Sequence, residues 1–279
     1  MQAKDQARLQ YLSSLVARKS VVPVASGRQI TQSPTYIVSA KIGTPAQTML
    51  LAMDTSNDVA WLPCSGCVGC SSAVFNSAKS TTFKTLGCQA AQCKQSVPPQ
   101  GLLGLGRGPL SLLSQSQKLY KSTFSYCLPS FRSLSFSGSL RLGPIGQPKR
   151  IKTTPLLKNP RRSSLYYVNL VAIRVGRRVV DIPPSALAFN PTTGAGTIFD
   201  SGTVFTRLVT PAYTAVRDAF RKRVGMQRTA GSITCLAMAA APDNVNSVLN
   251  VIANMQQQNH RILYDVPNSR IGVARERCT

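Results

Sequence analysis

Short runs in which apolar and polar residues alternate occur along most of this chain. Alternation with a period of two is typical of strands that bury one face. The pattern predicts strands over residues 36–42, 48–53, 124–128, 139–142, 166–175, 178–181, 197–199, 233–239, 247–253, 260–264 and 271–273. These strands are short and closely spaced, so the sequence predicts a mostly β protein.

Few segments have the spacing of a helix. The clearest is 210–224, which begins with Thr210 in the N-cap position and Pro211 in the first turn. Both residue types are favoured at those positions. Shorter helices are predicted over 109–119 and 5–19. The helical content is therefore small.

Changes in composition divide the chain into three parts. Residues 1–35 form a polar, charged segment in which no apolar stretch of a signal peptide is present. Residues 143–163 are rich in proline and basic residues and are the best candidate for a boundary between lobes. We therefore expect an N-terminal lobe over 36–150 and a C-terminal lobe over 151–279.

The chain is strongly basic, with 33 Lys and Arg against 9 Asp and Glu and a formal net charge of +24. Such a charge favours polyanionic partners such as nucleic acids or acidic polysaccharides. However, the basic clusters at 149–150, 161–162, 177–178 and 221–223 are scattered and have no interleaved aromatic residues. Nucleic-acid binding therefore ranks last, and a solvated basic surface is the simplest interpretation. The longest apolar runs are too short for a transmembrane helix.

Eight cysteines and one histidine limit the metal chemistry that is available. Cys64, Cys67 and Cys70 are spaced like metal ligands, but a zinc site usually needs a second pair or histidines. Disulfides are therefore favoured over metal, and they indicate an oxidising compartment. No metal and no cofactor is expected.

Two segments, one in each half of the chain, share an unusual pattern. In each, an apolar strand ends in an aspartate that is followed by small or hydroxyl residues: Asp54-Thr55-Ser56 and Asp200-Ser201-Gly202-Thr203. Each alone is explained by an ordinary Asx turn. Only nine acidic residues exist, however, so two in matching contexts suggest a pair. Two adjacent carboxyls share one proton and can hold a water for general acid–base hydrolysis at acidic pH.

These motifs and their order resemble the pepsin-like aspartic proteinases of plants, specifically the nucellin/nepenthesin-like branch (peptidase family A1). The resemblance covers most of residues 36–279 and includes Asp54 to Cys64, Gly101 to Ser111 and Ile198 to Thr203. It implies a bilobal β fold with a few short helices and a central cleft. It also implies that Asp54 and Asp200 are catalytic, with Thr55, Ser56, Ser201, Gly202 and Thr203 supporting the active-site loops.

Further expectations follow from the same resemblance. Leu102-Leu103-Gly104 and Arg270-Ile271-Gly272 match the elements that thread beneath the two aspartate loops. Residues 1–35 resemble the tail of a propeptide, which implies a zymogen. The protein is expected to be a secreted monomer of the apoplast or cell wall, acting on protein or peptide substrates, with no membrane or specific nucleic-acid partner.

The chain also departs from the family pattern. No tyrosine occurs between Tyr36 and Tyr120, so the flap hairpin that covers the cleft is missing near residues 93–101. A second segment is missing near 226–230, and Cys127 and Cys235 are expected to have lost disulfide partners. Ser56 replaces a usual glycine. Two hypotheses therefore stay open: an aspartic endopeptidase, and a catalytically impaired relative that binds protein or cell-wall polyanions.

Overall fold

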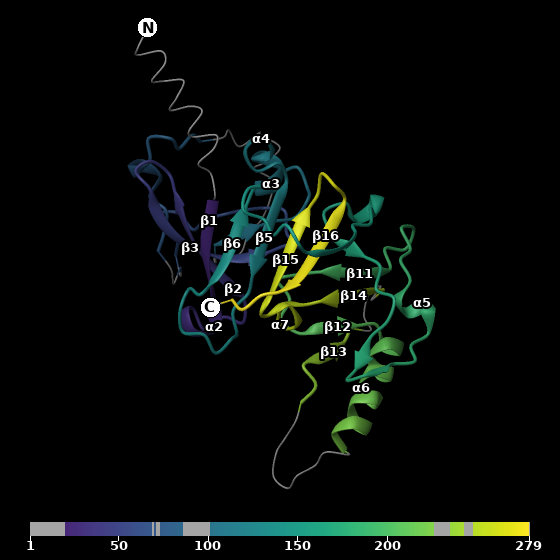
Figure 1. The fold of residues 1–279 in the computed structure, drawn as a ribbon. Helices are drawn as coiled ribbons and strands as arrows, with labels where there is room; N and C mark the ends of the chain where they lie inside the picture. The colour runs from purple at the N-terminus through teal and green to yellow at the C-terminus, as the bar shows by residue number, and fades with distance from the viewer. Residues whose placement is uncertain are drawn as a thin grey trace.

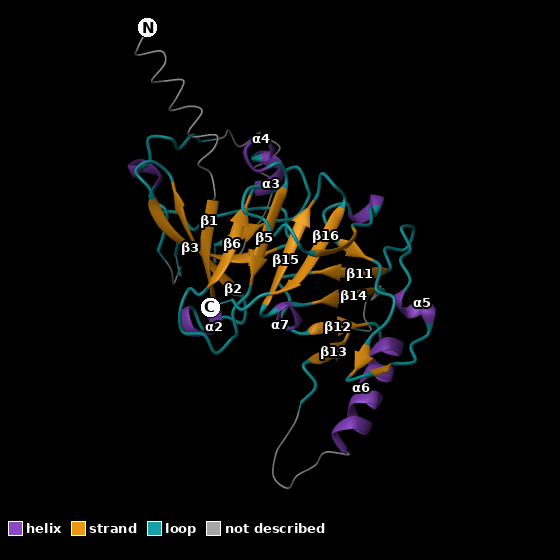
Figure 2. Cartoon of the chain, in the orientation of Figure 1, coloured by secondary structure: helices purple, strands orange, loops and turns teal. Residues whose placement is uncertain are grey.

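A computed structural model describes residues 20–68, 70, 73–85, 101–225, 235–242 and 248–278. The predicted helix over 5–19 and the two positions of the missing segments lie outside these residues. Most of the described chain forms strands, with few and mostly short helices (Figures 1 and 2). This confirms the predicted fold class.

The larger sheet has nine strands. They are β1 (Ser20–Ser26), β2 (Tyr36–Ile42), β3 (Gln47–Asp54), β4 (Leu102–Gly104), β5 (Thr123–Cys127), β6 (Gly138–Leu142), β7 (Lys152–Pro155), β15 (His260–Asp265) and β16 (Arg270–Arg275). Their order in space is β4-β3-β2-β1-β6-β5-β15-β16-β7. Only the β3–β4 pair is parallel. The β15–β16 hairpin comes from the end of the chain and lies between the early strands and the smaller sheet (Figure 1).

The smaller sheet has five strands in the order β13-β12-β14-β11-β8. They are β8 (Tyr167–Val168), β11 (Gly196–Phe199), β12 (Thr206–Leu208), β13 (Met238–Ala240) and β14 (Leu249–Ile252). A separate hairpin is formed by β9 (Arg174–Val175) and β10 (Arg178–Val179). In the smaller sheet, the second aspartate motif directly follows β11.

Among the described residues, the one long helix is α6 (Thr210–Gly225), where the sequence predicts it. The others are single turns: α2 (Gly27–Ile30), α3 (Leu112–Gln115), α4 (Gln117–Tyr120), α5 (Pro184–Leu187), α7 (Asn254–Gln257) and the 3-10 turns Ser77–Lys79 and Pro160–Arg162. The predicted helix over 109–119 is interrupted at Ser116, which has non-helical dihedrals and donates its hydroxyl to the Leu112 carbonyl. Serine competes with the helical hydrogen-bond pattern in this way.

Strand β1 lies in a segment for which the sequence predicts no strand. In the structure Pro23 lies opposite Ser139 of β6. The pairing of β1 with β2 begins at Val24. Residues 20–26 are thus an inner strand of the larger sheet. The division of the chain at residues 35 and 150 stays a prediction.

Four buried aromatic rings join the two halves of the chain at the centre of the core. The rings of Phe124 and Tyr264 stack with centroids 4.4 Å apart, and Tyr166 meets Tyr264 edge-on at 4.5 Å. Tyr126 lies beside Tyr264 at 5.6 Å. All four are fully buried. Aromatic pairs contribute about 0.5–1.5 kcal/mol beyond the burial of their area, so this cluster stabilises the junction of β5 with β15.

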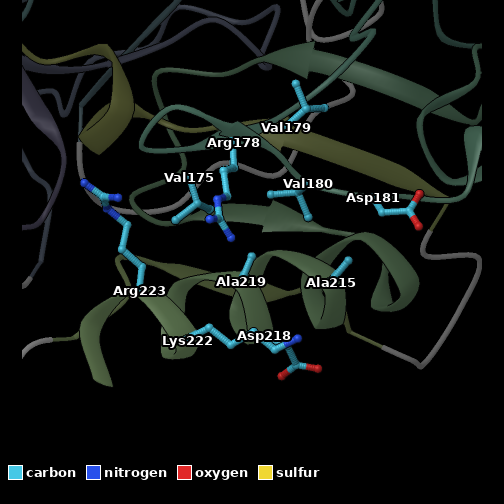
Figure 3. A pocket seen from close by; sticks show the side chains of 10 residues that line it. All are labelled: Val175, Arg178, Val179, Val180, Asp181, Ala215, Asp218, Ala219, Lys222 and Arg223. Atoms are coloured by element: carbon cyan, nitrogen blue, oxygen red, sulfur yellow. The ribbon is translucent and has the colours of Figure 1, made fainter. Parts of the chain in front are cut away.

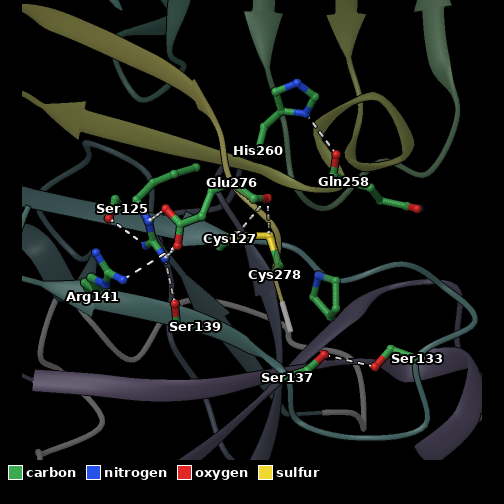
Figure 4. Close-up of a disulfide and its surroundings, with 12 residues drawn as sticks. Ser125, Cys127, Ser133, Ser137, Ser139, Arg141, Gln258, His260, Glu276 and Cys278 are labelled. Atoms are coloured by element: carbon green, nitrogen blue, oxygen red, sulfur yellow. Dashed lines mark hydrogen bonds and ion pairs between the residues drawn. A yellow bond between two sulfur atoms is a disulfide. The ribbon is translucent and has the colours of Figure 1, made fainter. Parts of the chain in front are cut away.

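The structure contains two disulfides among the described residues, Cys67–Cys70 and Cys127–Cys278. The expectation that Cys127 has lost its partner is therefore wrong, because the end of the chain returns beside β5. Cys235 is a free, exposed thiol, and so is Cys64. Beside the second disulfide, the fully buried Arg261 binds both carboxylate oxygens of Glu276 at 2.6 Å (Figure 4 shows Glu276 and its surroundings).

Candidate active site

The two aspartates lie at the ends of strands from the two halves of the chain. Asp54 is the last residue of β3, and Asp200 directly follows β11. Both strands are almost entirely apolar and buried near these ends. Each aspartate is therefore held at the point where a rigid, buried strand gives way to a turn.

The hydroxyl residues that follow the aspartates connect the two turns directly. The Thr55 amide donates to Oγ of Ser201 at 3.1 Å, and the Ser201 amide donates to Oγ1 of Thr55 at 3.0 Å. The Ser201 hydroxyl in turn donates to the carbonyl of Met53 at 3.2 Å. Thr55 and Ser201 are both fully buried. These bonds bring together two segments that are 146 residues apart.

Each carboxylate also accepts hydrogen bonds from its own turn. Oδ1 of Asp54 accepts from the amide and the hydroxyl of Ser56, both at 2.8 Å. Asp200 accepts from the Gly202 amide at 2.8 Å and from the Thr203 hydroxyl at 2.5 Å. All seven predicted site residues thus gather in one place. Serine in place of the usual glycine adds a donor to Asp54 rather than crowding the loop.

Gly202 shows how closely the two turns approach. A methyl group on its Cα would lie 2.6 Å from Cγ of Asp54, which is inside contact distance. The Asp54 carboxylate therefore lies against the backbone of the Asp200 turn. A side chain at position 202 would push the two turns apart, which is a physical reason for glycine there.

This arrangement changes the acidity of one carboxyl. Burial, together with the nearby charge of Asp54, raises the pKa of Asp200 from 3.8 to about 6, against the opposing effect of hydrogen bonds from Thr203 and Gly202. Asp200 is only 4% exposed, which explains why desolvation dominates. Asp200 thus holds a proton at mildly acidic pH.

A parallel strand lies beside each aspartate strand. Leu102–Gly104 pairs with the end of β3 as the sequence predicts, and the Leu105 amide donates to the Asp54 carbonyl at 2.8 Å. The corresponding neighbour of β11 is β14, and the Asp200 amide donates to the Ile252 carbonyl at 3.1 Å. The prediction for Arg270-Ile271-Gly272 is therefore wrong. That segment belongs to β16. The segment that pairs with the second aspartate strand is β14, which is followed by Ala253. The expected pattern has glycine at this position, so the sequence did not identify the segment.

Behind Asp200 lies a buried polar network that sequence reasoning missed. The amide group of Gln257 donates to the carbonyl of Asp200 at 3.1 Å, and its oxygen accepts from the Tyr126 hydroxyl. The hydroxyls of Tyr126 and Tyr264 lie 2.8 Å apart. Asn254 donates to the Ser201 carbonyl at 3.0 Å. No local pattern marks these residues, because they meet only in the folded chain.

Asp58 was missed as well, although it lies four residues after Asp54. Its carboxylate accepts from the Gly108 amide at 2.7 Å and from the Ser164 hydroxyl. Arg107 lies next to Gly108 and donates to the carbonyls of Ser164 and Leu165. Asp58 therefore joins the first aspartate loop to a segment of the second half. Its position among so few acidic residues was a usable signal.

In the described parts of the chain, no three metal-binding side chains of the His, Cys, Asp or Glu type gather at one point. The same residues include no helix that is long and apolar enough to cross a membrane. The predicted absence of a flap concerns residues 93–101, which begin outside the described residues, and it stays a prediction.

Two family models match this chain. The model described as xylanase inhibitor N-terminal matches residues 36–100 and 94–144, and the model described as xylanase inhibitor C-terminal matches residues 165–230. The two matches of the N-terminal model overlap at residues 94–100.

Two plant relatives match almost all of this chain. Aspartyl protease AED3 of Arabidopsis thaliana is 45% identical over 383 residues, which cover 100% of this chain and 85% of that protein. Aspartyl protease 25 of Oryza sativa subsp. japonica is 38% identical and covers 98% of this chain and 89% of its own length. The alignment with the Arabidopsis protein is longer than the 279 residues of this chain. That relative therefore carries internal segments that this chain lacks.

Solved structures agree in fold. A structure described as edgp superposes with a TM-score of 0.71 at 17% identity, covering 93% of this chain and 95% of that one. Basic 7S globulin from soybean superposes with a TM-score of 0.66 at 15% identity, covering 91% of this chain and 95% of its own. This chain therefore belongs, as a shortened member, to the pepsin-like aspartyl protease family of plants.

Proposed function

We propose that this protein is an aspartic endopeptidase that hydrolyses peptide bonds at acidic pH with Asp54 and Asp200 as its catalytic pair. One observation carries the proposal: the reciprocal hydrogen bonds of Thr55 and Ser201, which hold the two aspartate turns against each other. The protease names of the relatives with 45% and 38% identity support the same class of reaction.

The two carboxyls take different parts in this reaction. Asp200 holds the shared proton, since burial and the neighbouring carboxylate raise its pKa to about 6. Asp54 holds the negative charge and takes a proton from a bound water, while Asp200 donates its proton to the carbonyl oxygen of the scissile bond. The tetrahedral intermediate then collapses: Asp54 gives the proton that it took from the water to the nitrogen of the leaving amine, and Asp200 takes a proton back from the hydroxyl formed on the carbonyl oxygen, which restores the pair. Above pH 6 Asp200 loses its proton, so the rate falls.

The surrounding contacts keep this geometry rigid. Ser56 holds one oxygen of Asp54, and Gly202 and Thr203 hold both oxygens of Asp200. Preorganised donors of this kind lower the cost of reorganisation during the reaction. In enzymes with a lid, closure of the lid excludes water from the active site and positions the substrate, which increases the rate strongly. Without the flap we expect turnover to be slow.

We further propose that the protein acts outside the cell and is made with a propeptide. The disulfides Cys67–Cys70 and Cys127–Cys278 support an oxidising compartment. Its substrates are proteins or peptides. Acidic cell-wall polysaccharide as an additional partner stays a prediction.

The decisive experiment measures cleavage of an unfolded protein substrate between pH 2.5 and pH 8. We expect activity below pH 6 that a statine-type transition-state analogue blocks and that Asp54→Asn or Asp200→Asn abolishes. Gly194 has a positive φ and lies before β11, outside both aspartate turns, so Gly194→Ala serves as a control for mild destabilisation. If both Asn variants cleave as well as the parent, the assignment of the catalytic pair is wrong.

A further inference from the structure

Two basic clusters that are far apart in the sequence meet in the folded chain. The β9–β10 hairpin carries Arg174, Arg177 and Arg178, and the last turns of α6 carry Arg221, Lys222 and Arg223. All six side chains are exposed. Methyl substitution at Gly176 in the hairpin turn would place a carbon 2.6 Å from Cζ of Arg223, so the guanidinium rests against this turn. The sequence alone shows these clusters as scattered.

A groove runs between the hairpin and the helix beside these cations. Its cavity volume is about 420 Å³, and ten residues line it: Val175, Arg178, Val179, Val180, Asp181, Ala215, Asp218, Ala219, Lys222 and Arg223. Figure 3 shows Ala215 and Ala219 on the helix facing Arg178 and Val180 on the opposite segment. The groove thus has an aliphatic floor with cations at one end. It lies away from Asp54 and Asp200, neither of which lines it.

The cationic side chains of the groove are available to bind an anionic partner. Among the described residues, Arg178, Lys222 and Arg223 take part in no ion pair, whereas the lining Asp218 is bound by Arg217 at 2.9 Å. Asp181 lies at the other end (Figure 3). Val175, Ala215 and Ala219 on the floor are only partly buried, which leaves apolar surface in water. An occupant with carboxylates for the cations and aliphatic groups for the floor therefore complements this groove.

We propose that this groove binds an acidic peptide segment of a partner protein, with glutamate or aspartate side chains at Arg178, Lys222 and Arg223. Clusters of arginine are a recurrent means of recognising acidic motifs, because the guanidinium fork matches a carboxylate. A peptide also supplies aliphatic side chains for Val175 and the helix alanines. Nucleic acids bind by stacking bases on aromatic rings, and no aromatic residue lines the groove. The lining likewise lacks side-chain amides and hydroxyls, which a sugar chain needs for its many hydroxyl groups.

The test is a binding measurement on the full chain at pH 7.5, where no turnover is needed and the result does not depend on the proposed protease activity. The probe is a fluorescein-labelled peptide, Glu-Glu-Leu-Glu-Glu-Val-Glu-Glu, followed by fluorescence anisotropy. We expect binding in 50 mM NaCl that weakens strongly in 500 mM NaCl, since exposed charges are screened. Replacing Leu and Val in the probe by Ser is expected to weaken binding about threefold or more, because no aliphatic side chain of the peptide is then buried against the floor of the groove.

Two protein variants with the same change of charge locate the site. Arg178→Ala with Arg223→Ala is expected to weaken binding about five- to twentyfold, which is the range for two exposed ion pairs. Lys118→Ala with Arg132→Ala removes two exposed cations elsewhere and is expected to change it less than about twofold. Val175→Ser tests the floor without loss of charge and is expected to weaken binding of the peptide. Far-ultraviolet circular dichroism and the melting temperature show that each variant is folded.

Several results would overturn the proposal. One is equal loss of binding in both double variants, which would mean a non-specific effect of the net charge. Others are no effect of the Ser-substituted probe or of Val175→Ser, or no binding of the peptide in low salt. If polygalacturonate or a single-stranded oligonucleotide displaces the peptide at a lower concentration of charged groups than unlabelled peptide does, the groove is a polyanion site of another kind.

Discussion

Thr55 and Ser201 exchange backbone-to-side-chain hydrogen bonds in both directions, at 3.1 and 3.0 Å, although 146 residues separate them. Because both residues are fully buried, water cannot replace either bond. The position of each aspartate therefore depends on a hydroxyl from the other half of the chain.

Removing either hydroxyl is expected to weaken this connection. Thr55→Val keeps the shape of the side chain but leaves the buried Ser201 amide without an acceptor, which costs about 1–3 kcal/mol of unfolding free energy. Ser201→Ala is expected to cost a similar amount, and chemical denaturation measures both. The double variant is expected to cost less than the sum, since the two bonds form one unit. Additive losses would contradict the coupling of the two turns.

The raised pKa of Asp200 predicts how stability depends on pH. In the unfolded chain this carboxyl ionises near 3.8, but in the folded protein it does so at about 6. The stability due to its protonated form is therefore complete below pH 3.8 and is lost as the pH rises through 6. A shift of this size corresponds to about 3 kcal/mol. Asp200→Asn, which carries no charge, is expected to melt at a higher temperature than the parent at pH 7.5.

The same comparison at pH 3.5 supplies the control. There Asp200 is protonated in the parent, so the two proteins are expected to have similar melting temperatures. A stabilisation of Asp200→Asn that is the same at both pH values would show that ionisation of Asp200 is not its cause.

The ion pair of Arg261 and Glu276 predicts an acid-sensitive attachment of the C-terminal residues. The hydrogen bond from Arg261 lowers the pKa of Glu276 below its usual 4.5. The ion pair therefore stabilises the fold above pH 4.5, and this stability is lost as the pH falls through the lowered pKa. Glu276→Gln leaves the buried Arg261 without a countercharge, and we expect a loss of about 2–3 kcal/mol at pH 7, below the range for fully buried pairs because the Glu276 side chain is 33% exposed. Arg141→Ala is the matched control, because Arg141 contacts the same carboxylate from 3.6 Å and is partly exposed. Its expected cost is below about 1 kcal/mol.

The two disulfides are expected to differ strongly in their contribution. Cys127–Cys278 joins residues 151 positions apart, whereas Cys67–Cys70 joins residues three apart. A cross-link restricts the unfolded chain more when it closes a longer loop, so we expect Cys127→Ser with Cys278→Ser to cost about 2–5 kcal/mol. Cys67→Ser with Cys70→Ser is expected to cost much less. Thermal melts of both double variants check this, and equal losses would contradict it.

Much of the local structure could be predicted from the sequence. Alternating residues over 36–42 and 260–264 correspond to β2 and β15, and Thr210 with Pro211 marks the start of α6. The aspartate motifs also contain their own local hydrogen-bond partners in Ser56 and Thr203. These features depend on residues within a few positions of one another, so a single sequence is enough to predict them.

Only the tertiary structure decided which distant residues meet. Ile252 rather than Ile271 lies beside Asp200. Cys127 forms a disulfide with Cys278, and Arg178 lies across a groove from Arg223. The sequence determined two similar aspartate turns in two β-rich halves. Their convergence, and the burial that raises the pKa of Asp200, come from the packing of both halves around a common core, which no local pattern encodes.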